Sequence, residues 1–277
     1  MRLTFLGVRG STASPGPDFV RYGGNTSCIA VSGGERRPDL VLDAGTGLRG
    51  LPRLLDGASY SGGILLSHLH WDHVQGLPFC PAVDRDDAVV EVVMPAQDGK
   101  DGHDLLAQHM SPPAFPITPD GLRGAWTFTA AEVGRFGFGP YQVRATEISH
   151  KGGRTYGYRV DRGGTSLAYL PDHAPAAGVS DDTLETLRDV DLLVHDAQFV
   201  EAERGIADAF GHSTVGDAVD LAREVGARTL ALFHHGPGRT DDALDAVVSA
   251  LDGRAGRLGS LTVITPREGD VVELPGR

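Results

Sequence analysis

The chain has 277 residues, of which 40% are hydrophobic and 22% charged, a composition typical of a globular protein that can bury a sizeable core. It contains no run of about 18 apolar residues, so we expect no transmembrane helix and no membrane partner. Its formal net charge of −12 repels extended nucleic acid and disfavours a large RNA or DNA substrate.

The first residues predict a β-strand and not a signal peptide, because Gly7 and Arg9 interrupt a short apolar run. With two cysteines, Cys28 and Cys80, and no export signal, we expect free thiols in a reducing cytoplasm. Further short apolar runs, bounded by Gly, Pro and polar residues, indicate buried strands along the chain. The predicted strands are 2–8, 28–32, 40–42, 64–66, 89–94, 141–147, 155–160, 167–170, 192–194 and 230–233.

Helical patterns separate the later strands. Ser213 is a good N-cap for a helix that stops at Gly226, and Thr240 begins another that stops at Gly253. Within the segment 98–121, a short helical pattern is followed by four prolines that forbid regular structure. This segment is a candidate lid over a site, although an ordinary surface excursion fits it as well.

Strand-rich halves with helices outside predict an α/β sandwich of two mixed sheets flanked by helices, formed as one domain over residues 1–277. Six of the predicted strands run into His or Asp at or just beyond their ends, which suggests one site along one sheet edge. These terminal residues are Asp43, His68, His150, Asp172, the pair His195 and Asp196, and His234.

The segment SerHisLeuHisTrpAspHis, residues 67–73, carries the strongest chemical signal. His68 and His70 lie two residues apart, so in an extended segment they point the same way. Asp72 and His73 follow where the chain turns and can reach a neighbouring position. Imidazole and carboxylate ligands without thiolate suit zinc, and also manganese or iron.

This motif resembles the signature of the metallo-β-lactamase superfamily. The opening strand with its ArgGlySer end and the segments ArgTyrGlyGlyAsnThrSerCys, LeuAspAlaGlyThrGly, HisAspAlaGln and GlyHisSerThr look like its phosphodiesterase branch. That branch includes the tRNase Z enzymes and the phosphoribosyl cyclic phosphodiesterases. The resemblance covers essentially the whole chain and implies an αββα sandwich with metals at one sheet edge.

The resemblance also implies two metal-ligand sets. One metal would take His68, His70 and His150, and Asp172 would bridge to the second. The second metal would take Asp72, His73 and a late histidine, for which His234 is preferred over its neighbour His235. Asp43 is expected to orient a ligating histidine or the nearby backbone.

Asp196 and His212 match the carboxylate and histidine that work as a pair near the scissile phosphate in tRNase Z. Asp196 is one methylene shorter than the glutamate of that family, which puts its contact with His212 in question. His212 would stabilise the phosphoryl oxygens or protonate the leaving group. Ser213 alone is interpreted as a helix cap, and Asn25 as a polar substrate contact.

We therefore predict a dinuclear hydrolase with two divalent cations, zinc first, that cleaves a small or cyclic phosphodiester through a metal-bridging hydroxide oriented by Asp72. The alternative is a lactonase or arylsulfatase-type ester hydrolase on the same fold. A module that binds metal without turnover is disfavoured because every ligand position is filled. tRNA processing is disfavoured because no Gly- and Lys-rich arm is present. A homodimer remains open.

Overall fold

The computed structural model describes residues 1–34, 37–253 and 258–275. The first sheet contains β1 (Arg2–Gly7), β2 (Cys28–Ser32), β3 (Leu40–Leu42), β4 (Ser61–Leu65), β5 (Val89–Pro95), β6 (Ala125–Ala131) and β14 (Val271–Glu273). Its strand order is β14-β1-β2-β3-β4-β5-β6. The β1–β2 and β2–β3 pairs are antiparallel, and β3 to β6 are parallel.

The second sheet contains β7 (Gly134–Phe138), β8 (Tyr141–Ile148), β9 (Thr155–Arg162), β10 (Thr165–Leu170), β11 (Leu192–Asp196), β12 (Thr229–Phe233) and β13 (Thr262–Ile264). Its order is β13-β12-β11-β10-β9-β8-β7. The strands β7 to β10 pair antiparallel, whereas β10 to β13 are parallel. Both sheets are therefore mixed, as the sequence predicts.

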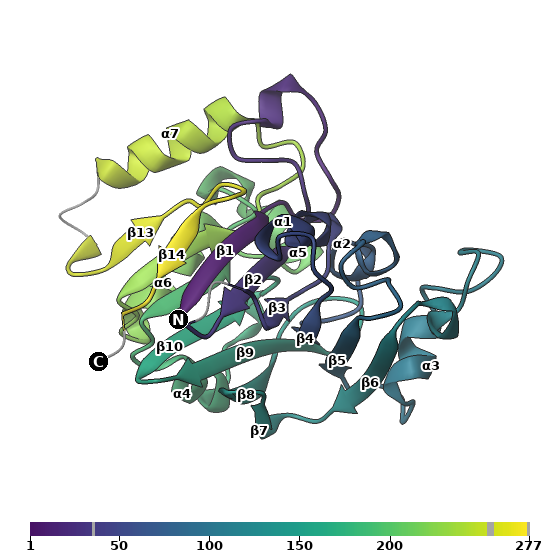
Figure 1. Ribbon diagram of the computed structural model, residues 1–277. Helices are drawn as coiled ribbons and strands as arrows, with labels where there is room; N and C mark the ends of the chain where they lie inside the picture. Colours follow the sequence, from purple (N-terminus) through teal and green to yellow (C-terminus); the bar gives the residue numbers. More distant parts are fainter. Residues whose placement is uncertain (35–36, 254–257, 276–277) are drawn as a thin grey trace.

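Helices cover the outer faces of both sheets (Figure 1). Those on the first sheet are α1 (Leu51–Leu54), α2 (Trp71–Val74) and α3 (Gly102–Ala107). The helices in the second half of the chain are α4 (Asp181–Leu187), α5 (Arg204–Phe210), α6 (Val215–Glu224) and α7 (Asp241–Asp252). The predicted αββα sandwich is confirmed.

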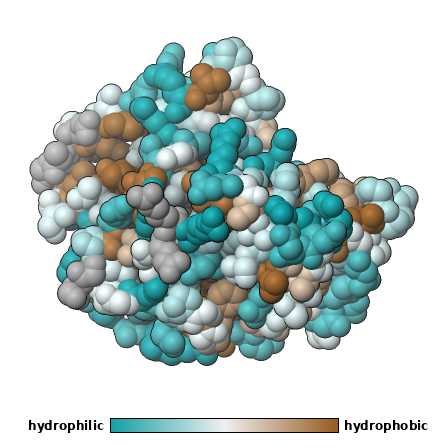
Figure 2. All heavy atoms as spheres, in the orientation of Figure 1, coloured by the Kyte–Doolittle hydropathy of each residue, from teal (hydrophilic) through white to brown (hydrophobic). Residues whose placement is uncertain are grey.

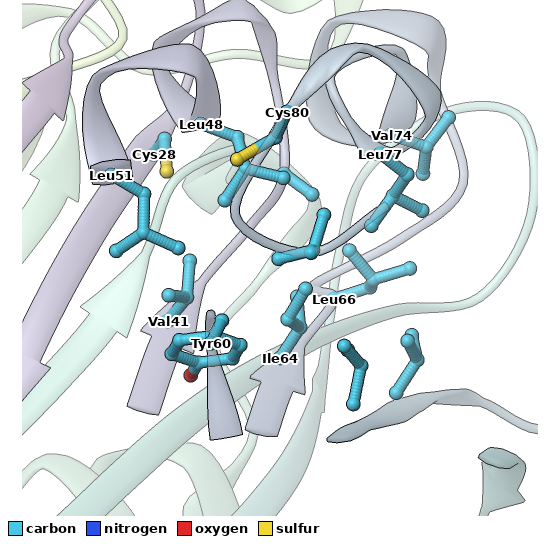
Figure 3. Close-up of a cluster of buried hydrophobic side chains, with 14 of the residues drawn as sticks. Cys28, Val41, Leu48, Leu51, Tyr60, Ile64, Leu66, Val74, Leu77 and Cys80 are labelled. Carbon is cyan, nitrogen blue, oxygen red and sulfur yellow. The ribbon is translucent and has the colours of Figure 1, made fainter. Parts of the chain in front are cut away.

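Three hydrophobic clusters hold these layers together, because each sheet face buries its apolar side chains against the next layer. One cluster lies between the sheets, with Phe5 and Leu42 from the first and Tyr169 and Phe233 from the second. A second joins the first sheet to its helices, and Figure 3 shows its strand and helix side chains facing one another. The third packs α4 and α6 on the second sheet. Both cysteines are free and buried, as expected.

Every predicted strand is present, with ends that differ by at most a few residues. The strands that the sequence did not predict are β6, β7, β13 and β14. Their side chains are largely exposed or half-buried, so they lack the short apolar runs by which buried strands are recognised. All four lie at or next to the edge of a sheet.

The expectation of a site along one sheet edge is wrong. Asp43 and His68 follow β3 and β4 of the first sheet, whereas His150, Asp172 and His234 follow strands of the second. The ligand-bearing ends of two packed sheets therefore meet, and the site lies between them.

The predicted cap of α6 is wrong by one residue. Thr214 is the N-cap, and its side chain accepts a hydrogen bond from the Asp217 amide in a capping box. Ser213 donates its hydroxyl to the His173 carbonyl instead (2.7 Å). Thr240 caps α7 as predicted.

The segment 98–121 is partly anchored, because α3 and the residue Met110 contribute to the buried cluster on the first sheet. In the described part of the chain, no helix is both long and apolar enough to cross a membrane. On the face drawn in Figure 2, hydrophobic residues occur in small separate groups among hydrophilic ones.

Candidate metal centre

Three histidines and one carboxylate form the first cluster. His68, His70, His150 and Asp172 each offer a ligand atom, and these atoms all lie within 4.8 Å of one another. His150 Nε2 is 3.3 Å from His70 Nδ1 and 3.4 Å from Asp172 Oδ2. His68 and His70 follow β4, and the other two follow strands of the second sheet.

Two histidines and one carboxylate form the second cluster, which consists of Asp72, His73 and His234. Asp72 Oδ2 lies 3.2 Å from His73 Nε2 and 3.1 Å from His234 Nε2. The Ser11 amide donates to the same carboxylate oxygen (2.7 Å). All three side chains of the cluster are buried.

Asp172 joins the two clusters. Its Oδ2 faces His68 and His150 of the first. Its Oδ1 is 3.2 Å from His73 Nε2 and 3.0 Å from His234 Nε2 of the second. One carboxylate therefore presents a different oxygen to each cluster, which is the geometry that a bridging ligand needs.

The residues fit divalent cations. His68 Nε2, His73 Nε2 and Asp172 Oδ1 are buried polar atoms with no hydrogen-bond partner in the described structure, and such atoms cost free energy unless something satisfies them. Burial opposes protonation of His73, yet Asp72, Asp172 and Asp43 raise its pKa well above the ordinary value. The surrounding carboxylates thus favour positive charge at this point. Nitrogen and oxygen donors without thiolate suit zinc, manganese or iron.

Asp43 orients two of the histidines, as predicted. His73 donates Nδ1–H to Asp43 Oδ2 (2.6 Å). His68 Nδ1 lies 3.0 Å from the Ser67 hydroxyl, which itself donates to Asp43 Oδ2 (2.8 Å). Tyr169 donates its hydroxyl to the same oxygen. These bonds occupy Nδ1 of each histidine and leave Nε2 for the cluster.

Neutral groups orient His150 and His234. His150 donates Nδ1–H to the Gly211 carbonyl (2.7 Å), and His234 donates Nδ1–H to Gln198 Oε1 (3.0 Å). Close packing adds to this, because a Cβ at Gly10 would lie 2.3 Å from His234 Nδ1. Sequence reasoning missed Gln198, although it stands two residues after Asp196 in a motif already singled out.

The structure places His234, and not His235, in the second cluster. His235 lies on the opposite face, beside Arg9 and with its ring edge against Tyr22. Burial, and then the positive charge of Arg9, lower the pKa of His235 to about 3. The preference for His234 is supported by this geometry.

Asp196 and His212 are in contact despite the shorter aspartate. His212 Nδ1 lies 2.8 Å from Asp196 Oδ2, which also accepts from the His173 and Ser213 amides. Burial lowers the pKa of His212, but Asp196 outweighs it and raises the pKa to about 9. Asp196 is fully buried, so an effect of this predicted pair on a substrate would have to be exerted through His212.

Asn25 does not lie at the clusters. Its backbone and side-chain N–H groups donate to the Glu268 carboxylate at 2.5 and 2.8 Å. Both residues line a separate pocket on the outside of the first sheet. The predicted substrate contact through Asn25 is therefore not supported by its position, because its amide is committed to Glu268.

A pocket of about 790 Å³ opens over both clusters. His70, Asp72, His150, Asp172 and His212 line its floor. Residues that the sequence did not assign complete its walls, and these are Ser11, Trp71, His109, Lys151, Gly152, Gln198, Phe199, Ile206, Phe210 and Pro237. A substrate entering this pocket would meet the cluster residues and His212 together.

Two adjoining His/Asp clusters, placed where the strand ends of two packed sheets meet, have the donor groups that a metal-dependent hydrolase requires. A sequence profile of the beta-lactamase superfamily domain matches residues 39–235, which is more than half of the chain. The chain belongs to this superfamily, and it is a metal-dependent hydrolase.

Similar proteins agree with this assignment. The Ribonuclease Z of Haloarcula marismortui is 27% identical in an alignment of 312 residues that spans 91% of this chain and 93% of the relative. The metallo-beta-lactamase fold protein YhfI from Bacillus subtilis has a TM-score of 0.71 at 19% identity, covering 99% and 98% of the two chains. The short form of human tRNase Z has a TM-score of 0.68 at 21% identity and covers 99% of this chain and all of its own.

The expectation that a large nucleic acid is disfavoured as a substrate is wrong. Relatives that match almost the full length of the chain are named as ribonucleases. The net charge of −12 is a sum over the whole molecule, whereas approach of a polyanion depends on local fields.

Proposed function

We propose that this protein is a phosphodiesterase that uses two divalent cations, zinc in the first instance, held by the two clusters. The first cation would take His68, His70 and His150, the second Asp72, His73 and His234, and Asp172 would contact both. Cations held there would supply Lewis acidity and stabilise negative charge developing on a phosphoryl group.

The observation that carries the proposal is the position of His212. It lies in the pocket beside both clusters, with its ring centroid 4.9 Å from that of His150 and 5.2 Å from that of His234. Asp196 occupies Nδ1, which leaves Nε2 for the pocket. A histidine held in this way can carry a proton at Nε2 and donate it to the leaving oxygen of a diester.

Other residues of the chain prepare the site for this step. The Ser11 amide holds Asp72 at the floor of the pocket, and Gln198 bonds both the Ser11 hydroxyl and His234. These bonds keep the pocket side of the second cluster in one arrangement, so that a phosphate group meets preformed partners and little reorganisation is needed.

The ribonuclease names of the relatives direct the choice of natural substrate toward an RNA phosphodiester. The small or cyclic phosphodiester predicted from the sequence is the substrate with which an RNA phosphodiester should be compared. Both kinds of substrate present the same reacting group to the clusters and to His212, so a ribonuclease assay and a small-diester assay belong in the same experiment.

Replacing His212 tests the proposal. We expect His212→Ala to keep two metals and a near-wild-type melting temperature, while kcat on a diester falls by about 10²–10⁴-fold. A diester with a 4-nitrophenolate leaving group should lose less than one with an alkoxide, because nitrophenolate leaves without a proton.

His103→Ala is the matched control, since His103 lies outside the pocket. It should leave both rates unchanged. If His212→Ala hydrolyses both diesters as fast as the wild type, the phosphodiesterase proposal loses its support. Faster turnover of lactones or aryl sulfates than of any diester would also refute the proposal.

A further inference from the structure

A second, smaller pocket adjoins the metal centre, and we call it the aromatic pocket. It has a volume of about 300 Å³ and lies between α2 and the segment 98–121. Its walls include Trp71, Phe79, His109, Met110 and Phe115. Figure 1 shows α2 and α3 toward the same end of the first sheet, near β5 and β6.

The aromatic pocket shares part of its wall with the metal-centre pocket. Trp71 and His109 line both cavities. Trp71 stands in the chain between His70 of the first cluster and Asp72 of the second, so its backbone position is set by the residues that would hold the metals. Trp71 is therefore a side chain that a group bonded to a phosphate at the clusters would meet at the border of the aromatic pocket.

The exposure of these aromatic side chains is unusual. Trp71 is 71% exposed and Phe79 58% exposed. Two further exposed apolar residues, Ile206 and Phe210 on α5, line the metal-centre pocket. Large apolar side chains gathered at one place on a surface mark a binding site, because leaving them in water is unfavourable.

The chemistry of the pocket restricts what it can hold. No charged residue lines it, and its polar side chains are those of Gln75 and His109. A second phosphate or a sugar would find few partners there. A planar aromatic group would stack on Trp71 and Phe79 and could bond its edge to an amide or an imidazole.

We propose that the aromatic pocket is a subsite for a nucleobase, and that Trp71 stacks on the base of the nucleotide next to the scissile phosphate. This assignment rests on the proposed phosphodiesterase function, because the phosphate at the clusters is what brings the base to Trp71. It makes Trp71 a specificity determinant that separates nucleotide diesters from alkyl diesters.

A binding experiment tests the subsite without turnover. AMP and ribose 5-phosphate carry the same phosphate and sugar and differ in the base, so calorimetry with zinc-loaded protein isolates the contribution of the base. We expect wild type to prefer AMP. Trp71→Ala should weaken AMP binding by about 5- to 150-fold, the usual span for loss of one stacked base, and leave ribose 5-phosphate unchanged.

Two variants keep this test specific. Trp71→Phe retains an aromatic face and should preserve most of the preference for AMP. Val133→Ala removes another exposed apolar side chain, outside both pockets, and should behave as wild type.

A turnover experiment separates the subsite from the function. Bis(4-nitrophenyl) phosphate and methyl 4-nitrophenyl phosphate share a leaving group and differ in the retained group. Trp71→Ala should lower the ratio of their kcat/KM values, aryl over methyl, and change the methyl ester little. Hydrolysis with an unchanged ratio and unchanged AMP affinity would overturn the subsite and leave the proposed function standing.

The converse result is also informative. A preference for AMP that Trp71→Ala abolishes, in a protein that cleaves neither diester, would support the subsite and refute the phosphodiesterase. Wild type that binds AMP no better than ribose 5-phosphate would refute the subsite. A dimer by light scattering that Trp71→Ala converts to monomer, with AMP affinity unchanged, would assign the pocket to contact between copies and also refute it.

Discussion

The two clusters share Asp172 but differ in burial and charge. The second consists of buried side chains, has Asp72 as a carboxylate of its own and contacts Asp43 directly through His73, whereas Asp43 reaches the first only through Ser67. In the first, His70 is half-buried and lines the pocket together with His150, and no carboxylate besides Asp172 belongs to it among the described residues. Two cations held there would therefore meet different surroundings, with mostly imidazole ligands at the first cluster and extra negative charge at the second.

We infer from this difference that the second cluster holds its cation more firmly. Coulombic attraction to a cation grows with each nearby carboxylate and is screened less when the pair is buried. The open first cluster is the side on which a substrate can approach and on which exchange with solvent is easier. Three sets of substitutions test this difference between the clusters, beginning with the one that removes the ligand both clusters share.

Removing the shared ligand should have the largest effect. Asp172→Ala takes a carboxylate oxygen from both clusters. We expect fewer than two metals per chain by elemental analysis, and a fall in activity of about 10³-fold or more, because Lewis-acid stabilisation is worth several kcal/mol. Asp220→Ala, an exposed aspartate on α6, is the control. Two metals retained in Asp172→Ala would contradict the bridging geometry.

Adjacent histidines at the end of β12 provide the next test. His234→Ala should lose the second metal and most of the activity, while the first metal remains. His235→Ala should keep both metals, since its side chain lies on the opposite face beside Arg9. Metal analysis of the two variants in parallel gives the answer, and loss of metal from His235→Ala alone would move the ligand by one residue.

The smallest effect is expected from a substitution of Asp43, which lies behind the second cluster. Asp43→Asn keeps the size of the side chain but removes the charge that orients His73. Affinity for the second metal should fall by about 10- to 100-fold, a usual span for such supporting groups. In a chelator titration, the wild type should release one weakly held and one strongly held metal. Asp43→Asn should release two metals of similar affinity. An unchanged difference between the two affinities would mean that burial, and not Asp43, causes it.

Much of this protein could be predicted from local patterns. Short apolar runs identified the strands that bury both faces, and the spacing of residues 67–73 identified the ligands that enter both clusters. The edge strands β6, β7, β13 and β14 could not be found in this way, because their side chains are mostly solvated and carry no hydrophobic periodicity.

Residue roles that depend on contacts between distant parts of the chain were harder to predict from the sequence. Asn25 looked like a substrate contact until its pairing with Glu268, 243 residues away, was seen. The contact between Asp196 and His212 was in question because the aspartate is short, and only the structure shows it, with Asp196 buried behind the histidine. Net charge argued against nucleic acid, although charge at a binding surface is a local property that the sum over the chain does not report.

The sequence by itself therefore determined the sandwich, the ligand types and the spacing within the 67–73 motif, because these depend on neighbours in the chain. Only the tertiary structure decided that Asp172 presents one oxygen to each cluster, that Gln198 holds His234, and that Trp71 borders a second pocket. Those features arise where the ends of two sheets are packed together, and packing brings into contact residues that no local pattern relates.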